Sequence, residues 1–287
     1  MSNAVLATGP FFERNADGQR FCFFHAPVPG PHGVRGCVLA VHAFAEEMNK
    51  TRAAAADGAR ALAAAGFAVL QVDLAGCGDS GGEFEDATWA AWLSDLGEAW
   101  AWMQSHCTGP RWVWGTRFGA LLADQFASIC MPAVDGLLLW QPVVNGAQHL
   151  GQFLRLKTVN SLLREAASAD VTTSVARAAQ PSPRADLAAG RAIEVAGYRL
   201  TPALADAMEA ARLGAPTSRT PPRVRWFEVS TQPDASLSPV AKKVAERWRG
   251  LGSDVAVAHV VGSAFWQTAE IERCDGLVNA TVEALCA

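Results

Sequence analysis

The sequence lacks the features that mark several large classes of protein. No apolar run approaches the roughly 18 consecutive residues that a membrane span needs. The net charge is -4 and no block is rich in lysine or arginine, which argues against nucleic acid or an anionic membrane as the main partner. Residues 1–20 have neither the charged start nor the apolar core of a signal peptide, so we expect a cytoplasmic protein.

The number and spacing of the cysteines, and the scarcity of tyrosine, also limit the classes of protein to consider. The seven cysteines are odd in number and lack the C-x-x-C or C…H spacing of a zinc site, so we expect reduced thiols, no metal and no cofactor. Tyrosine occurs once, against ten tryptophans. Four of these tryptophans fall in one helical stretch, at residues 89, 92, 100 and 102, with apolar residues between them. This spacing predicts core packing and not a ligand cage.

Short apolar stretches alternate with helical ones. Half of the residues are hydrophobic, which is enough for one large core. The predicted strands are residues 36–44, 67–73, 111–115, 135–142, 224–230 and 254–262. The predicted helices are residues 51–66, 88–105, 118–129 and 239–252, and a last one from about residue 267. Strands that are apolar on both faces and separated by helices indicate a parallel sheet covered on both sides.

The alternation breaks between residues 145 and 220, where the chain is polar and helical with a proline-rich interruption. We expect this segment to be a helical lid at the carboxyl ends of the strands, where such sheets bind ligands. The predicted organisation is a first core part at 1–144, the lid at 145–220 and a second core part at 221–287.

Several strings resemble a known family. HAFAEE after one strand, DLAGCGDSGG after the next, the turn WGTRFGA and the later STQPDASLSP together resemble the α/β-hydrolases over nearly the whole chain. HAFAEEMNK, GCGDSGG, LLLWQPVV and AFWQTAEIE are more narrowly similar to the second hydrolase type of bacterial exosortase A systems. The resemblance implies an α/β-hydrolase fold with about eight strands and a lid. It also implies a link to exopolysaccharide and surface-protein sorting.

The same resemblance implies a serine, a histidine and an acid, and the sequence departs from this pattern twice. The turn GTRFG keeps both glycines of the nucleophile elbow, but Arg117 stands where the serine belongs. After the last strand Ala264 or Phe265 replaces the histidine, and His259 falls inside the strand. Asp234 remains at the place of the acid. A serine-hydrolase triad is therefore not available at the usual positions.

Other groups near the elbow are weaker candidates for a nucleophile. Thr116 adjoins the turn but has no obvious base. Cys77 would react only if a positive charge such as Arg117 lowered its pKa, and otherwise it is a packed core residue. Ser80 lies in the same glycine-rich loop, where serine more often satisfies backbone groups.

Arg117 needs a partner, because an unpaired buried guanidinium is too costly. One alternative is a protein carboxylate from Glu46, Glu47 or Asp234; the other is an external carboxylate or phosphate. The two glutamates precede Asn49, which we expect to cap the following helix.

Further residues are expected around the same mouth. His42 either braces the loop that shapes an oxyanion hole or serves only the fold. Gln141 and Trp266 are expected to line the mouth, and His149, Arg155 and Lys157 lie at the entrance to the lid.

Two kinds of function remain open from the sequence. One is an enzyme that hydrolyses or modifies acyl or glycan groups without the elbow serine. The other is a non-catalytic protein that binds a small anionic, acyl or glycan-type ligand. A scaffold for other proteins is a weaker third, and the oligomeric state stays open.

Overall fold

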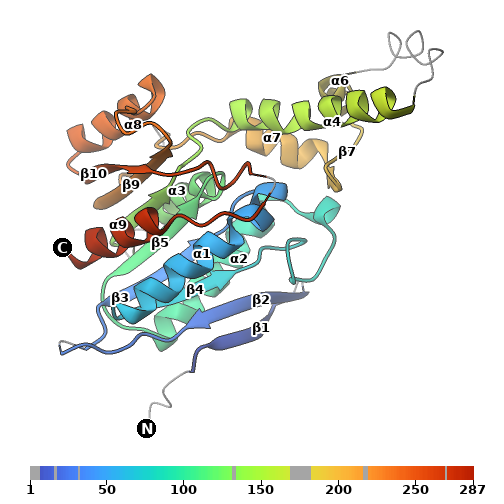
Figure 1. Ribbon diagram of the computed structural model, residues 1–287. Coiled ribbons are helices and arrows are strands. Elements are labelled where there is room, and N and C mark those ends of the chain that lie inside the picture. Colours follow the sequence, from blue (N-terminus) through green and yellow to red (C-terminus); the bar gives the residue numbers. More distant parts are fainter. Residues whose placement is uncertain are drawn as a thin grey trace.

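The computed structural model describes residues 7–15, 18–31, 33–130, 134–168, 182–215, 219–268 and 270–287. One sheet of eight strands runs through the molecule in the order β1-β2-β4-β3-β5-β6-β9-β10 (Figure 1). The first two strands pair antiparallel with their neighbours, and the other six are parallel. The strands are β1 Gly9–Asn15, β2 Gly18–His25, β3 Gly36–Val41, β4 Phe67–Val72, β5 Arg111–Thr116, β6 Gly136–Trp140, β9 Arg223–Ser230 and β10 Asp254–Val261.

Helices cover both faces of this sheet (Figure 1). The helices α1 and α9 pack on one face, and α2, α3 and α8 pack on the other. They are α1 Glu46–Ala64, α2 Trp89–His106, α3 Gly119–Cys130, α8 Pro239–Gly250 and α9 Asp275–Cys286, and the short helix η1 is Phe84–Asp86. The predicted fold class, a mostly parallel sheet of about eight strands between helices, is confirmed.

The central strands divide their side chains between two hydrophobic cores. In β3, Leu39 and Val41 face the core under α2 and α3, whereas Val38 and Ala40 face the core under α1 and α9. Successive side chains of a strand point to opposite faces, so a strand that is apolar at every position must be covered twice. The tryptophans of α2 belong to the first core, as predicted: Trp92 and Trp100 are buried in it.

The segment between β6 and β9 folds outside the sheet (Figure 1). It contains α4 Gly146–Ser168, α6 Pro183–Ala188, a two-stranded antiparallel hairpin of β7 Ile193–Val195 and β8 Tyr198–Leu200, and α7 Pro202–Ala210. The expectation of helices alone was wrong here, because Gly197 takes a positive φ of 86° and turns the chain into the hairpin.

Helix α4 lies over the ends of β3 and β5. The ring of Phe153 on α4 is 5.1 Å from that of Phe44, which follows β3, and the ring of His149 is 5.2 Å from that of Phe118, which follows β5. Helix α4 therefore packs against the segments that follow these two strands.

The structure differs from the sequence predictions in two strands that were not predicted and in the starts of two helices. Strands β1 and β2 were not predicted, and the last helix begins at Asp275 and not near residue 267. Helix α1 begins at Glu46, so Asn49 lies inside it and is not its N-cap. Within the described ranges no helix is long and apolar enough to cross a membrane, and no group of three potential ligand side chains could hold a metal ion.

Candidate functional site

The turn between β5 and α3 keeps the shape of a nucleophile elbow. Its central residue, Arg117, has a φ of 54°, a left-handed conformation that side-chain-bearing residues seldom adopt. Both flanking glycines are required by close approach: a Cβ at Gly115 would collide with the backbone of Ala120, and one at Gly119 with the carbonyl of His42. The backbone is therefore bent as in an elbow, and the residue that it presents is an arginine.

The protein itself satisfies the guanidinium of Arg117. Nη2 and Nε donate to the two carboxylate oxygens of Glu47 at 3.0 and 3.1 Å, and Nη1 donates to the carbonyl of Gln141 at 3.2 Å. The ring centroid of Trp266 lies 4.8 Å from Cζ, a cation–π distance. Arg117 is 8% exposed and Glu47 is 7% exposed. Of the two partners considered from the sequence, the structure has the internal carboxylate.

The first turn of α1 delivers that carboxylate. Because the helix begins at Glu46, its second residue Glu47 points toward the elbow, and both acidic side chains lie at the positive end of the helix dipole. Asp234 lies elsewhere: it is exposed in the turn that follows β9. The choice among three predicted carboxylates is thus decided by where the helix starts.

A cleft of about 440 Å³ opens beside this pair. Its walls come from α1, α4 and the segment after β10, and the residues include Glu46, Glu47, Lys50, His149, Arg155 and Trp266. Three of them bring a buried polar atom that has no hydrogen-bond partner among the described residues: Oε2 of Glu46, Nδ1 of His149 and Nε1 of Trp266. Such atoms are costly to bury unpaired, so their clustering marks a place where a ligand or water belongs.

Burial also changes the titration of two of these groups. Burial, and then the charge of Glu47, raises the pKa of the Glu46 carboxyl. Burial lowers the pKa of His149 to about 4, although the charge of Glu47 acts against this shift. The His149 imidazole is therefore neutral at neutral pH, stacked on Phe118 with a free ring nitrogen.

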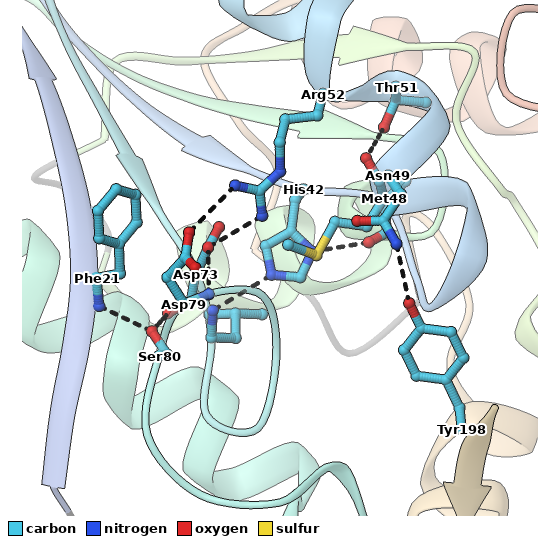
Figure 2. A network of polar contacts seen from close by, with 12 residues as sticks. Phe21, His42, Met48, Asn49, Thr51, Arg52, Asp73, Asp79, Ser80 and Tyr198 are labelled. Carbon is cyan, nitrogen blue, oxygen red and sulfur yellow. Dashed lines mark hydrogen bonds and ion pairs between the residues drawn. The ribbon is translucent and has the colours of Figure 1, made fainter. Parts of the chain in front are cut away.

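Two predicted nucleophiles lie in the loop after β4, away from the cleft. The Ser80 hydroxyl accepts from the amide of Phe21 at 2.8 Å and donates to the carbonyl of Asp73 at 2.5 Å, so it ties the loop to β2 (Figure 2). Burial, and then the charges of Asp73 and Asp95, raise the pKa of Cys77 to about 12. The idea that Arg117 activates this thiol is wrong, because Arg117 is not among the charges that act on it, and burial, Asp73 and Asp95 outweigh the one basic group that does, Arg52.

Three other predicted residues lie next to the elbow but outside the cleft. Nδ1 of His42 donates to the Ala43 carbonyl at 2.7 Å, and its Nε2 accepts from the amide of Leu74 at 3.3 Å. Gln141 contributes its backbone carbonyl to Arg117, and its side chain accepts from the Val229 amide. Thr116 faces a different cavity, under α1.

Lys50 was missed from the sequence. It lines the cleft from α1, three residues after Glu47 and four after Glu46, so it shares their helical face. The correct start of α1 would have found it. Lys157, on α4, does not line the cleft, whereas Arg155 does.

Comparisons with known proteins agree with this architecture. The family model described as serine aminopeptidase, S33, matches residues 32–221. The chain is similar in structure to Est1E of Butyrivibrio proteoclasticus with bound ferulic acid, at a TM-score of 0.66 and 13% identity, covering 96% of this chain and 98% of that one.

A thermostable carboxyl esterase of Bacillus coagulans, in complex with glycerol, has a TM-score of 0.64 and 13% identity over 98% of both chains. A soluble variant of monoglyceride lipase from Saccharomyces cerevisiae has a TM-score of 0.58 and 13% identity, covering 99% of this chain and 96% of that one. A search of the curated proteins found no match. At these identities the structural likenesses establish the α/β-hydrolase fold alone.

Proposed function

The chain belongs to the S33 serine aminopeptidase family, and we propose that it is a member that binds a ligand in the elbow cleft without covalent catalysis. The observation that carries this proposal is the bidentate pair of Arg117 and Glu47 at the position of the nucleophile. A guanidinium stays protonated in proteins and cannot attack a carbonyl carbon. Here it is also held by three acceptors and an aromatic ring.

The pairing also limits what the ligand can be. The sequence left open an external anion as the partner of Arg117. Because Glu47 neutralises Arg117, we do not assign the elbow to such an anion. Among the described residues, the buried atoms of the cleft without a hydrogen-bond partner are one carboxylate oxygen, one indole N–H and one neutral imidazole nitrogen. A ligand group that both donates and accepts hydrogen bonds can pair with these donors and acceptors, and a hydroxyl is such a group. We therefore assign the cleft to a ligand rich in hydroxyl groups, a glycan-type molecule.

Two further features agree with a glycan-type ligand. Lys50 and Arg155 on the cleft wall would bind a carboxylate or phosphate substituent on it. The strings similar to exosortase A hydrolases would give the ligand a setting in exopolysaccharide metabolism. In this account α4 acts as a lid, since it closes the cleft with His149 and Phe153.

Calorimetric titration with methyl glucoside, glucuronate and butyrate tests the proposal. We expect glucuronate to bind most tightly, methyl glucoside more weakly and butyrate least. Glu46→Ala should weaken the binding of both sugars at least tenfold, whereas Glu246→Ala, an exposed glutamate on α8, should leave it unchanged. Butyrate binding more tightly than either sugar, or Glu46→Ala binding like the native protein, contradicts the proposal.

A second candidate function is hydrolysis by a water molecule that Glu46 activates. The raised pKa of this carboxyl, in a cleft with a histidine whose Nδ1 has no partner among the described residues, favours it. Turnover of nitrophenyl esters or glycosides by the native protein, abolished in Glu46→Gln with ligand affinity retained, would establish this candidate over the first.

A further inference from the structure

A second cavity lies under α1, on the other side of its first turns from the elbow cleft. It measures about 220 Å³ and is bounded by α1 and the ends of β2, β3, β4 and β5. It shares no lining residue with the cleft. Most of its wall is apolar, including Phe21, Phe23, Val41, Met48, Val72 and Trp114.

The charged and ionisable groups around this cavity are already paired (Figure 2). Asp73 accepts from Arg52 and from the backbone amide of Asp79, both at 3.0 Å. His42 uses both ring nitrogens, and burial lowers its pKa, which keeps it neutral. The cavity therefore offers no free charge to a ligand.

One polar group of the wall has no hydrogen-bond partner among the described residues. Trp114 is 0% exposed, and its indole N–H has no hydrogen-bond partner in the described part of the chain. Thr116, which is 3% exposed, also lines the cavity. A buried donor without an acceptor is costly, and Trp114 is one of the residues that line the cavity.

We propose that this cavity binds a small, uncharged, mainly apolar molecule that carries one carbonyl oxygen. The carbonyl accepts from the N–H of Trp114, and the apolar remainder contacts the phenylalanines of β2 and the alanines of α1. The size agrees, because an apolar cavity of about 150 Å³ already holds benzene. The proposal is independent of what occupies the elbow cleft.

Acetophenone and α-methylstyrene test this directly, since they have the same shape and only the first has an acceptor. In ligand-detected NMR titrations we expect acetophenone to bind about fivefold more tightly, the value of one ordinary hydrogen bond. Trp114→Phe should remove this difference. Trp100→Phe, which removes another buried and unpartnered indole N–H on the far face of the sheet, should leave the difference intact.

A variant that fills the cavity provides a second test that does not depend on the tryptophan. Ala55→Phe places a ring in the cavity from α1 and should abolish the binding of both compounds. Ala53→Phe, also half-buried on α1 but outside the cavity, should bind both as the native protein does. Failure of both compounds to bind the native protein, equal binding of the two, or unchanged binding in Ala55→Phe would overturn the proposal.

Discussion

The pair of Arg117 and Glu47 is best understood beside a second buried pair, that of Arg20 and Asp95. In the second pair Nε of Arg20 lies 2.6 Å from Oδ1 of Asp95, with side chains 5% and 1% exposed. The other oxygen of Asp95 accepts from the amide of Ala75 at 2.7 Å. This pair joins β2, α2 and the loop after β4. It lies beside a void of about 10 Å³, room for no more than one water.

The two pairs have similar chemistry and different surroundings. Both are buried, and both link elements that are distant in sequence. Only Glu47 also lines a cleft large enough for a ligand, with unpartnered polar atoms on its neighbours. The difference teaches that burial and pairing alone do not mark a site; the open space and the unsatisfied groups beside the pair do.

The largest expected effect is on stability and is the same for both pairs. Arg117→Ala and Arg20→Ala should each lower the free energy of unfolding by about 3–5 kcal/mol, because each leaves a buried carboxylate unpaired. Urea unfolding followed by circular dichroism measures this. Removing Arg184, whose pair with Glu209 is exposed, should cost about 1 kcal/mol or less. If the Arg117→Ala variant were as stable as the native protein, the buried carboxylate of Glu47 would not need Arg117 as its partner.

A smaller effect distinguishes the cleft through its histidine. The folded pKa of His149, about 4, is below its ordinary value of 6.5, so its contribution to stability is present above pH 6.5 and is lost as the pH falls toward 4. His149→Phe keeps the stacking on Phe118 and cannot titrate. The difference in free energy of unfolding between this variant and the native protein should shift by about 2 kcal/mol in favour of the variant between pH 8 and pH 5. Parallel stability curves from pH 8 to pH 5 would show that this imidazole is not buried as described.

The unpaired glutamate of α1, Glu46, should also affect stability in a pH-dependent way. The folded pKa of Glu46 is raised above its ordinary value of 4.5, so its contribution to stability is present below that value and is lost as the pH rises. Glu46→Gln should therefore be more stable than the native protein at pH 8, and the gain should vanish near pH 4. Thermal unfolding across this range is the measurement, and a gain that grows toward low pH contradicts the assignment.

The smallest expected effect is on turnover. Arg117→Ser restores a serine to the bent turn, but Ala264 or Phe265 stands where the resemblance to the α/β-hydrolases implies a histidine, and neither side chain can act as a base. We expect the variant to hydrolyse nitrophenyl acetate no faster than the native protein. A clear rise in rate would show that the elbow still has a base within reach.

The sequence predicted the sheet well and the partner of Arg117 poorly, for physical reasons. Strands such as β3 and β4 are apolar at nearly every position, a pattern that only a doubly covered strand produces. Strand β2 alternates between exposed and buried residues near the sheet edge, so its signal is weaker.

Glu46, Glu47 and Asp234 were equivalent as candidates because the helix start was placed after Asn49. A shift of a few residues in a helix start turns a side chain to another face, and the capping pattern was misleading at Ala45, which has a φ of 49° and no side-chain cap. Trp266 was placed near the mouth from the sequence, but its stacking on Arg117 depends on the irregular segment before α9, which periodicity does not predict.

Intact-mass spectrometry after incubation with a fluorophosphonate tests the central claim most directly, that the elbow presents a paired arginine and the chain has no activated serine. The reagent adds to a serine that a neighbouring base has activated. We predict that the native protein keeps its unmodified mass under conditions that label an esterase control completely. Stoichiometric addition, mapped to Ser80 or to any other serine, would contradict the account.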